Sequence, residues 1–518
     1  MDRTEFFGSQ VGGESIINYS YTDMPWKLIM WDIYHFFTFS WALPWVLWPV
    51  RPCDGGHFDE LSLTRQNIWC MFLHAILIVL QGSFILVLPL TLLFPAWLVA
   101  IWMSGFFAIN WFICLGLNGK TITFNSDPKY APALEEHAHE QWIFLNGVAV
   151  GEAWLQSNIN RLALTFKRPI IGVHNRTTGV IFDVVECLIQ RNFGYATGDI
   201  RAAYKIVKEK LYNPQYSKVV FILHSQGGIE GGLVLDWLLQ ELPQDLLAKL
   251  EVYTFGNASN HFNNPHRHAD SQEVERKFPN ISTQIPKTID EIPLTHSPVE
   301  THAPCSRRRL SNSSISSYVH NCFSGFTSMS KESNVSHETT YTVAASDRAI
   351  SHVEHYAHTT DFVALWGILH FVTNENASPT MPRYIGRVFS RTSTRGGHQF
   401  CQHYLNGMFP LVRDYKGEFI GCADSNEFMN SVVELSGRGT EKDNVREGIE
   451  NSWPMLELAG RRASFIKDEV ALHGSFHEDT NGIYDGKVRV KDLSRLWQYR
   501  NGRSPPDLPR ELRRTTLE

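Results

Sequence analysis

The segment around Ser225 holds the residues of this chain that are best suited to nucleophilic chemistry. It reads Phe221-Ile-Leu-His-Ser-Gln-Gly-Gly228, with an apolar run before the serine and two glycines after it. A serine hydroxyl is a weak nucleophile unless it lies near a base and near donors that stabilise a developing oxyanion. A strand that turns sharply into a helix meets both needs, because it presents the side chain at the sheet edge beside the helix's first N–H groups.

The residues on either side of Ser225 fit such a turn. Residues 218–223 predict a strand and residues 228–242 a helix, and Gly227 and Gly228 allow a tight approach behind the serine. The segment resembles the nucleophile elbow, G-x-S-x-G, of the α/β-hydrolase superfamily, and of its lipase and esterase members in particular. Leu223 stands where the motif has its first glycine. We therefore expect a local rearrangement that makes room for this larger side chain.

The resemblance implies an acid and then a histidine later in the chain. Asp361 follows a predicted strand at 350–356, where the family places its carboxylate, and it would orient the imidazole and stabilise it when protonated. Glu354 is the competing carboxylate, but it lies inside that strand. The alternative for Asp361 is a structural role as the N-cap of a helix that begins at Phe362.

Two histidines could supply the base, and both lie in Arg395-Gly-Gly-His-Gln-Phe-Cys-Gln-His-Tyr404. His398 follows two glycines soon after the last predicted strand, as in the common Gly-His pattern of the family, and is preferred. His403 remains the alternative base, or else a neighbour of the site. His224 is adjacent to Ser225 in the chain and cannot easily fold back onto it.

A second donor for the oxyanion should come from an earlier loop. Asn146-Gly-Val148 follows a predicted strand at 142–145 and resembles the corresponding lipase loop, with Asn in place of His. The resemblance implies that the backbone N–H groups of Val148 and Gln226 form the oxyanion hole. A plain Asn-Gly turn is the alternative.

Strands and helices alternate around these positions. The predicted strands are 142–145, 169–173, 218–223, 250–255, 350–356 and 384–389, and helices of 10–15 residues separate most of them. This order predicts an α/β class with parallel pairing, and the resemblance implies an α/β-hydrolase fold over residues 136–410. A Ser/Thr-rich stretch at 261–345 predicts an inserted segment with too few apolar residues to order itself. Residues 411–518 predict a polar, partly disordered extension with one helix at 490–499.

The region before this domain is strongly apolar. From Ile68 to Leu117 the chain has no Asp, Glu, Lys or Arg. That length, about 50 residues, is enough for two membrane spans of about 20 residues each. Pro89 and Pro95 divide it into 68–88 and 96–117, which predicts a helical hairpin that either crosses the bilayer or dips into it.

The flanks of this hairpin also suggest a membrane location. Residues 1–67 predict a juxtamembrane segment in which 26–50, rich in Trp and Phe, lies along the bilayer surface or forms a third span. Basic residues flank the hairpin at Arg65, Lys120 and Lys129, which favours an intracellular membrane with the α/β domain on the cytosolic side.

Other classes of function have little support. The net charge is -6, and without a basic face nucleic-acid binding is not expected. The eight cysteines are scattered and no HExxH motif is present, so neither a metal nor another cofactor is expected.

The sequence thus predicts a membrane-bound serine hydrolase that cleaves carboxylic esters of acyl lipids through an acyl-enzyme on Ser225. Its expected partners are the lipid bilayer and the acyl ester. The alternatives are an inactive scaffold that keeps the fold, or a thioesterase or acyltransferase built on it.

Overall fold

The computed structural model describes residues 2–7, 24–47, 54–265, 267, 348–373, 384, 386–436 and 489–505. Most of the predicted insertion at 261–345, and 437–488 and 506–518 of the C-terminal extension, lie outside these described residues. The predictions made for them therefore stay predictions.

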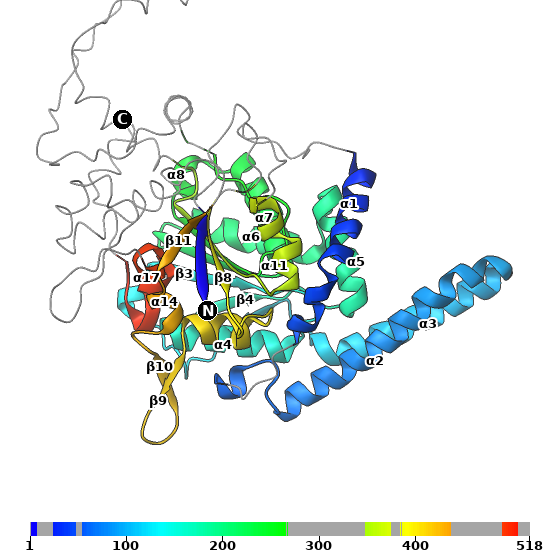
Figure 1. Cartoon of the computed structure of the whole chain (residues 1–518), viewed down its shortest axis with the longest axis horizontal. Coiled ribbons are helices and arrows are strands. Elements are labelled where there is room, and N and C mark those ends of the chain that lie inside the picture. Colours follow the sequence, from blue (N-terminus) through cyan, green and yellow to red (C-terminus); the bar gives the residue numbers. More distant parts are fainter. Residues whose placement is uncertain are drawn as a thin grey trace, which may run out of the picture.

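A mixed, mostly parallel sheet forms the centre of the domain (Figure 1). Within the described residues its nine strands lie in the order β11-β1-β8-β7-β6-β5-β3-β4-β2. They are β1 (Arg3–Phe7), β2 (Thr123–Asn125), β3 (Glu140–Leu145), β4 (Ile170–Val173), β5 (Lys218–His224), β6 (Leu250–Phe255), β7 (His352–His358), β8 (Arg387–Thr392) and β11 (Val433–Ser436). The six strands β3 to β8 pair in parallel with one another, whereas β2 pairs antiparallel with β4 and β1 pairs antiparallel with β8. The predicted α/β class is confirmed.

Helices cover both faces of this sheet, as parallel sheets require. Trp142 and Phe144 of β3 pack into one apolar cluster and Ile143 and Leu145 into the other, which is the alternation that a strand imposes. The first face carries α4 (Glu152–Phe166), η6 (Phe400–Leu405), α13 (Asn406–Met408), α14 (Glu427–Asn430), α17 (Val490–Leu493) and η8 (Leu496–Gly502). The second carries α6 (Gly198–Tyr212), α7 (Gln226–Glu241), α8 (Gln244–Leu247), α11 (Phe362–Trp366) and α12 (Ile368–Thr373).

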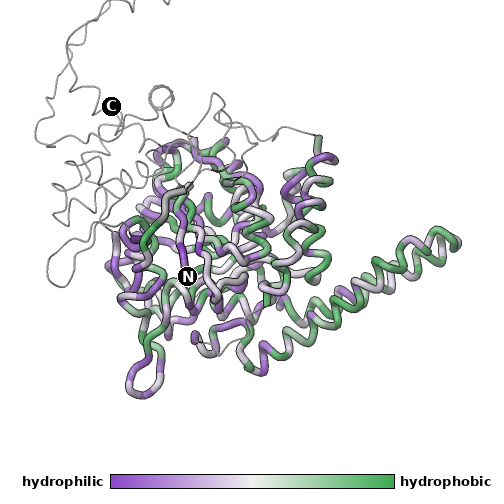
Figure 2. The backbone as a smooth tube through the Cα atoms, in the orientation of Figure 1, coloured by the Kyte–Doolittle hydropathy of each residue, from purple (hydrophilic) through white to green (hydrophobic). Residues whose placement is uncertain are grey.

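Two long apolar helices extend away from this body (Figure 1). They are α2 (Arg65–Val87) and α3 (Ala96–Asn118), joined by the short helix η3 (Leu88–Leu93), and both are long and apolar enough to cross a bilayer. Figure 2 shows that apolar residues dominate along the projecting part. We call α2, η3 and α3 together the hairpin.

The remaining elements belong neither to the sheet and the helices on its two faces nor to the hairpin. In the N-terminal region they are α1 (Pro25–Thr38), η1 (Ser40–Val46), η2 (Gly56–Phe58) and η4 (Glu135–His137). Helix α5 (Val180–Phe193) packs beside α1, and β9 (Leu411–Arg413) and β10 (Phe419–Cys422) form a separate small hairpin. Helix α1 has 14 residues, fewer than the roughly 20 that a membrane span needs.

The first and last described segments of the chain take part in the sheet and its core. Strand β1 lies between β8 and β11, and β11 comes from the segment predicted as a polar extension. Farther along, Leu496, Trp497 and Tyr499 are buried against the first face of the sheet. The described part of 411–518 is therefore packed onto the α/β domain, a result that its polar composition did not indicate.

A buried ion pair fixes this C-terminal segment at the amino ends of the strands. Arg495 Nη2 lies 2.8 Å from Glu251 Oε1 on β6. The hydroxyls of Tyr253 and Tyr499 also donate to Glu251, at 2.7 and 2.8 Å. Burial alone would raise the pKa of Glu251, but the charges of Arg495 and Lys218 hold that pKa below its usual range.

Removing this ion pair should destabilise the whole domain. Arg495→Ala leaves the buried Glu251 carboxylate without its closest positive charge, so we expect the free energy of unfolding to fall by about 3 kcal/mol. Arg503→Ala is the matched control, because Arg503 pairs with Asp424 at side-chain exposures of 52% and 66% and should contribute less than about 1 kcal/mol. Urea unfolding followed by circular dichroism in detergent measures both. Equal losses would contradict the role of Arg495.

Candidate functional site

The candidate residues meet at one edge of the sheet because four parallel strands end there. The loops that follow β3, β5, β7 and β8 carry Asn146–Val148, Ser225, Asp361 and His398 in turn. Carboxyl ends of parallel strands lie at the same edge, which is where such sheets place ligand sites. Positions that are more than 250 residues apart in the sequence are thereby brought together.

Ser225 occupies the turn between β5 and α7 in a strained conformation. Its φ and ψ are 58° and -121°, a region that costs a non-glycine residue about 1–3 kcal/mol. Its N–H donates to the carbonyl of Phe255 at 3.0 Å, which ties the turn to β6. Gly227 faces the Leu145 carbonyl and Gly228 faces the Asn257 side chain, so closely that a Cβ at either position would lie within 2.6 Å of them.

The structure shows how Leu223 is accommodated in place of the motif's glycine. Its side chain is fully buried and points at Gly231, one turn into α7. A Cβ at Gly231 would lie 2.3 Å from Leu223 Cδ1. The glycine missing before the serine is thus compensated by one that follows it on the helix.

His398 connects Ser225 with Asp361. Its Nε2 lies 3.0 Å from Ser225 Oγ, and its Nδ1 lies 3.0 Å from Asp361 Oδ2. A carboxylate only accepts, so the neutral ring carries its proton on Nδ1 and leaves Nε2 to accept the serine O–H. The structure thus brings the three residues singled out from the sequence into one hydrogen-bonded chain.

Asp361 is fully buried and receives further hydrogen bonds. Tyr404 donates its hydroxyl to Oδ2 at 2.6 Å, and the N–H of Val363 donates to Oδ1 at 2.8 Å. Burial alone would raise the pKa of Asp361, but the neighbouring His398 and these donors hold that pKa below its usual range. Asp361 therefore acts as the N-cap of α11 and as the partner of His398 at the same time. Glu354, the competing acid, instead accepts hydrogen bonds from Tyr356 and from the N–H of Arg495.

The two other histidines near the site have different positions. His403 accepts a 2.9 Å hydrogen bond from the N–H of Gln399 through its Nδ1. His224 lies with its ring centre 4.8 Å from that of His398, and its Nε2 donates to the His398 carbonyl at 2.9 Å. Burial, and then the neighbouring His398, lower the pKa of His224 to about 3. His224 is thus a neutral donor that holds the backbone of His398.

The β3–α4 loop (residues 146–151) lies directly against Ser225. A Cβ at Gly147 would be 2.4 Å from Ser225 Cβ, so only glycine fits this approach. Gln226 is the first residue of α7, where a backbone N–H has no acceptor within the helix. The loop that carries Val148 and the helix start that carries Gln226 therefore flank the serine, as expected from the sequence.

Buried amides hold the β3–α4 loop in place. Asn146 donates to the carbonyl of Asn175 and accepts from the N–H of Asn175, each at 2.9 Å. The Asn175 side chain then donates to the side chain of Gln226 at 2.8 Å. The N–H of Ala149 donates to Asp183 at 2.9 Å. This fixed frame is the preorganisation that stabilisation of a developing charge requires.

Glu60 is a residue near the site that sequence reasoning missed. Its carboxylate accepts the N–H groups of Cys401 and Gln402, at 2.8 and 3.1 Å, just after His398. Burial raises the pKa of Glu60 to about 7, although these two donors oppose the shift. Glu60 is separated from this loop by more than 300 residues, and its local sequence shows no motif.

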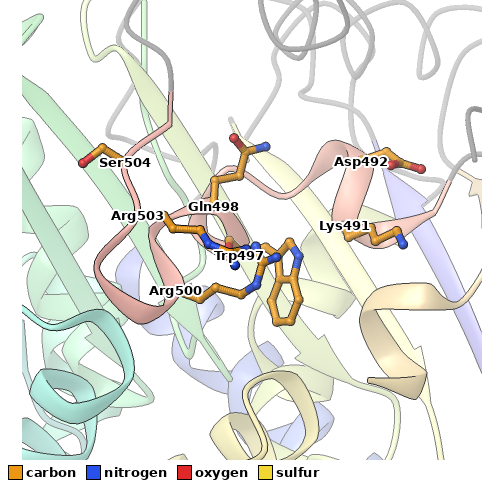
Figure 3. Close-up of a pocket in the computed structure, with 7 residues that line it drawn as sticks. All are labelled: Lys491, Asp492, Trp497, Gln498, Arg500, Arg503 and Ser504. Carbon is orange, nitrogen blue, oxygen red and sulfur yellow. The ribbon is translucent and has the colours of Figure 1, made fainter. Parts of the chain in front are cut away.

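Among the described residues, no group of three or more His, Cys, Asp or Glu is arranged to hold a metal ion. An open hollow with a volume of about 300 Å³ lies elsewhere on the domain. Figure 3 shows the residues that line it, Lys491, Asp492, Trp497, Gln498, Arg500, Arg503 and Ser504. This hollow lies on the segment fixed to the amino ends of the strands, at the opposite end of the sheet from Ser225.

Comparison with known proteins adds no relative. No family model, no curated protein and no solved structure matches this chain.

The pairing of Leu223 with Gly231 predicts a strong coupling between the two positions. Gly231→Ala forces a methyl group against Leu223 and should cost about 1–3 kcal/mol through overpacking. Leu223→Ala should cost about 2–5 kcal/mol through the cavity that it leaves. Alanine at 223 makes room for the methyl group added at 231. The double variant should therefore lose at least about 1 kcal/mol less free energy of unfolding than the two single variants lose together. Strict additivity in urea unfolding would show that the two side chains do not compete.

The raised pKa of Glu60 predicts that the stability of the domain falls as pH rises from acidic to neutral. The ordinary value of 4.5 applies to the unfolded chain and about 7 to the folded one. The protonated form is therefore favoured by folding, and its contribution, at most about 3 kcal/mol, is lost as pH rises from 4.5 through 7. Glu60→Gln cannot titrate, so its melting temperature should fall less between pH 5 and pH 8 than that of the parent, whatever its absolute stability. Glu209→Gln, an exposed carboxylate, serves as the control and should keep the parent slope.

Proposed function

We propose that this protein is a membrane-associated serine hydrolase with an α/β-hydrolase fold, which cleaves carboxylic esters of acyl lipids. The observation that carries the proposal is the hydrogen-bonded chain from Ser225 through His398 to Asp361. The order serine, acid, histidine along the sequence and the strained turn at Ser225 support it. Strands β3, β5, β7 and β8 supply the loops in the order that the resemblance implies.

The proposed reaction follows from these contacts. Ser225 Oγ attacks the ester carbonyl while His398 Nε2 accepts its proton, and Asp361 stabilises the imidazolium. The N–H groups of Val148 and Gln226 stabilise the oxyanion of the tetrahedral intermediate. The intermediate collapses as His398 returns the proton to the leaving alcohol, which leaves an acyl group on Ser225. Water, activated by His398, then releases the carboxylic acid and restores the serine.

An apolar cluster beside the site supports an acyl substrate. Val148, Ile229 and Val363, neighbours of the candidate residues in the chain, belong to one cluster with η1 and α11. Apolar walls with a few convergent polar groups are typical of sites for apolar ligands. Ser225 is 1% exposed, so side chains above it have to shift when an ester enters. The hairpin would keep the enzyme at a bilayer, where such esters are concentrated.

An intracellular membrane with the α/β domain in the cytosol is the proposed location. The five described cysteines are free and buried, which agrees with a reducing compartment. Both ends of the hairpin meet the same body, so the domain lies on one side of the bilayer.

Labelling with a fluorophosphonate probe tests the proposal. The full-length protein should react covalently, and Ser225→Ala should not, because the probe bonds to an activated serine. Ser259→Ala is the matched control, since Ser259 is also buried and its hydroxyl bonds to Tyr384. Labelling that persists in Ser225→Ala would falsify the assignment, and absence of labelling in the parent protein would favour the inactive scaffold.

Variants of the two histidines separate the alternatives for the base. His398→Gln should lower kcat for a soluble ester by roughly 1000-fold or more, as loss of a catalytic base does. His403→Gln changes the same kind of side chain in the same segment and should retain most of kcat. The opposite result would identify His403 as the base.

A further inference from the structure

The hairpin is attached to the body along one side of each helix. A stripe of α2 is buried while its opposite side is exposed. The buried residues of this stripe are Asn67, Cys70, Leu73, His74, Leu77, Gln81 and Phe84. On α3 the buried residues are Phe106, Asn110, Cys114, Leu117 and Asn118, and residues 96–105 contain none. The lower part of the hairpin is therefore covered by protein on its inner side.

Buried amides make this attachment firm. Gln81 Nε2 and Asn110 Nδ2 both donate to the carbonyl of Thr178, at 2.7 and 3.1 Å. Asn118 exchanges two hydrogen bonds with the backbone of Thr177, at 2.7 and 3.0 Å. Separating the hairpin from this loop would leave these groups unpaired in an apolar setting, which is costly. The base of the hairpin therefore belongs to the domain.

The outermost contact between the hairpin and the domain is aromatic. Phe182 of α5 packs against Phe84 of α2 and Phe106 of α3, with ring centres 6.1 and 5.8 Å apart. Beyond these two residues the buried stripe of each helix ends. Within the described structure, the part of the hairpin that can be surrounded by lipid on all sides is therefore residues 85–105.

This free part is too short to cross a bilayer. On the outgoing arm it consists of 85–87 of α2 and the 3-10 helix η3, which together rise about 16 Å. On the returning arm, residues 96–105 of α3 rise about 15 Å. The hydrocarbon core is about 30 Å thick, so the tip reaches only about its middle.

A second apolar surface lies on the side of the body from which the hairpin projects. Exposed aromatic and apolar side chains recur along the outer side of α1 and into η1, and at every fourth residue of α5, with exposures between 39% and 69%. They are Trp26, Met30, Tyr34, Phe37, Trp41, Val185, Ile189 and Phe193. Helix α1 is fixed in this orientation because its inner Asp32 pairs with Arg191 of α5 at 3.0 Å. We call this set the aromatic face.

The aromatic face is continuous with the hairpin. Helix α5 contacts α1 through Arg191 and contacts the hairpin through Phe182. Figure 1 shows α1 and α5 on the side of the body from which the hairpin projects. Exposed Trp, Tyr and Phe side chains gathered on one surface are typical of a surface that lies in the headgroup region.

We propose that the protein is monotopic, embedded in a single leaflet, with the hairpin tip near the bilayer centre and the aromatic face in the headgroup layer. The hairpin tip and the aromatic face both contact lipids of this one leaflet. This inference rests on the membrane attachment in the proposed function and is independent of ester hydrolysis. It excludes both a transmembrane hairpin and a protein held at the surface by the hairpin alone.

The depth of the hairpin tip tests this proposal. In Leu92→Cys, an 89% exposed position of η3, the thiol is labelled in detergent with the fluorophore NBD, and the full-length protein is reconstituted into phosphatidylcholine vesicles. We expect stronger quenching by nitroxides at the acyl-chain ends than by nitroxides near the headgroup. We also expect protection from dithionite, a membrane-impermeant reductant, added outside or trapped inside. The parent protein, labelled in the same way, corrects for native cysteines.

Each other outcome overturns the proposal. Bleaching by trapped dithionite would mean that the hairpin crosses the bilayer, and bleaching from outside would mean that the tip never inserts. Tyr415→Cys is the matched control, because Tyr415 is 91% exposed in the loop of the β9–β10 hairpin and should bleach from outside. The same measurement in Ser225→Ala needs no activity, so it stands even where hydrolysis is not found.

Photocrosslinking tests the aromatic face separately. The photoreactive residue p-benzoylphenylalanine replaces Phe37 or Phe193 in the full-length protein in the same vesicles. Both positions should form adducts with phosphatidylcholine, as should Leu92 at the tip, whereas Tyr415 should form none. Adducts at Leu92 without any at Phe37 and Phe193 would show that the hairpin alone contacts lipid and would overturn the single-leaflet arrangement.

Discussion

The imidazole of His398 has to reach Ser225 with one nitrogen and Asp361 with the other, and the surrounding loops are held so that it does. His224 donates a hydrogen bond to the carbonyl of His398, and Glu60 accepts the N–H groups of Cys401 and Gln402 at the start of η6. Tyr404, from that same helix, donates to Asp361. Because each of these partners is buried, a displaced imidazole would leave several unpaired polar groups, and the arrangement is therefore specified by more than the three residues themselves.

The hairpin and the loop beside Ser225 share one set of buried hydrogen bonds. Thr177 and Thr178 accept from the amides of the hairpin and also donate to Asp183, whose other contact is the N–H of Ala149 in the β3–α4 loop. The base of the hairpin is thus connected through Thr177, Thr178 and Asp183 to the loop beside Ser225, so removing the hairpin would also remove support from this loop.

The sequence was informative where neighbouring residues determine the outcome. The strand, turn and helix at 218–242 follow from local pattern, and Asp361 and His398 follow from their places after strands. Which of His398 and His403 lies beside Ser225 could be seen only from distances, since both are histidines in one segment. Glu60, the compensation of Leu223 by Gly231, and the pairing of β1 with β11 could not be predicted, because each joins residues that no local pattern connects. The segment 490–505 is polar on average, so its composition did not predict that a few large apolar side chains pack into the core.

The position of β1 has a consequence for how the chain is made. Residues 3–7 are synthesised well before both of their neighbours in the sheet, 387–392 and 433–436. Strand β1 therefore has no sheet partner while the residues between them are made, and an unpaired strand is prone to wrong association. The apolar hairpin is completed far earlier, at residue 118. With the proposed membrane attachment, the nascent chain would reach the bilayer before the sheet can be completed, and a chain stalled before 433 would leave one edge of β1 unpaired.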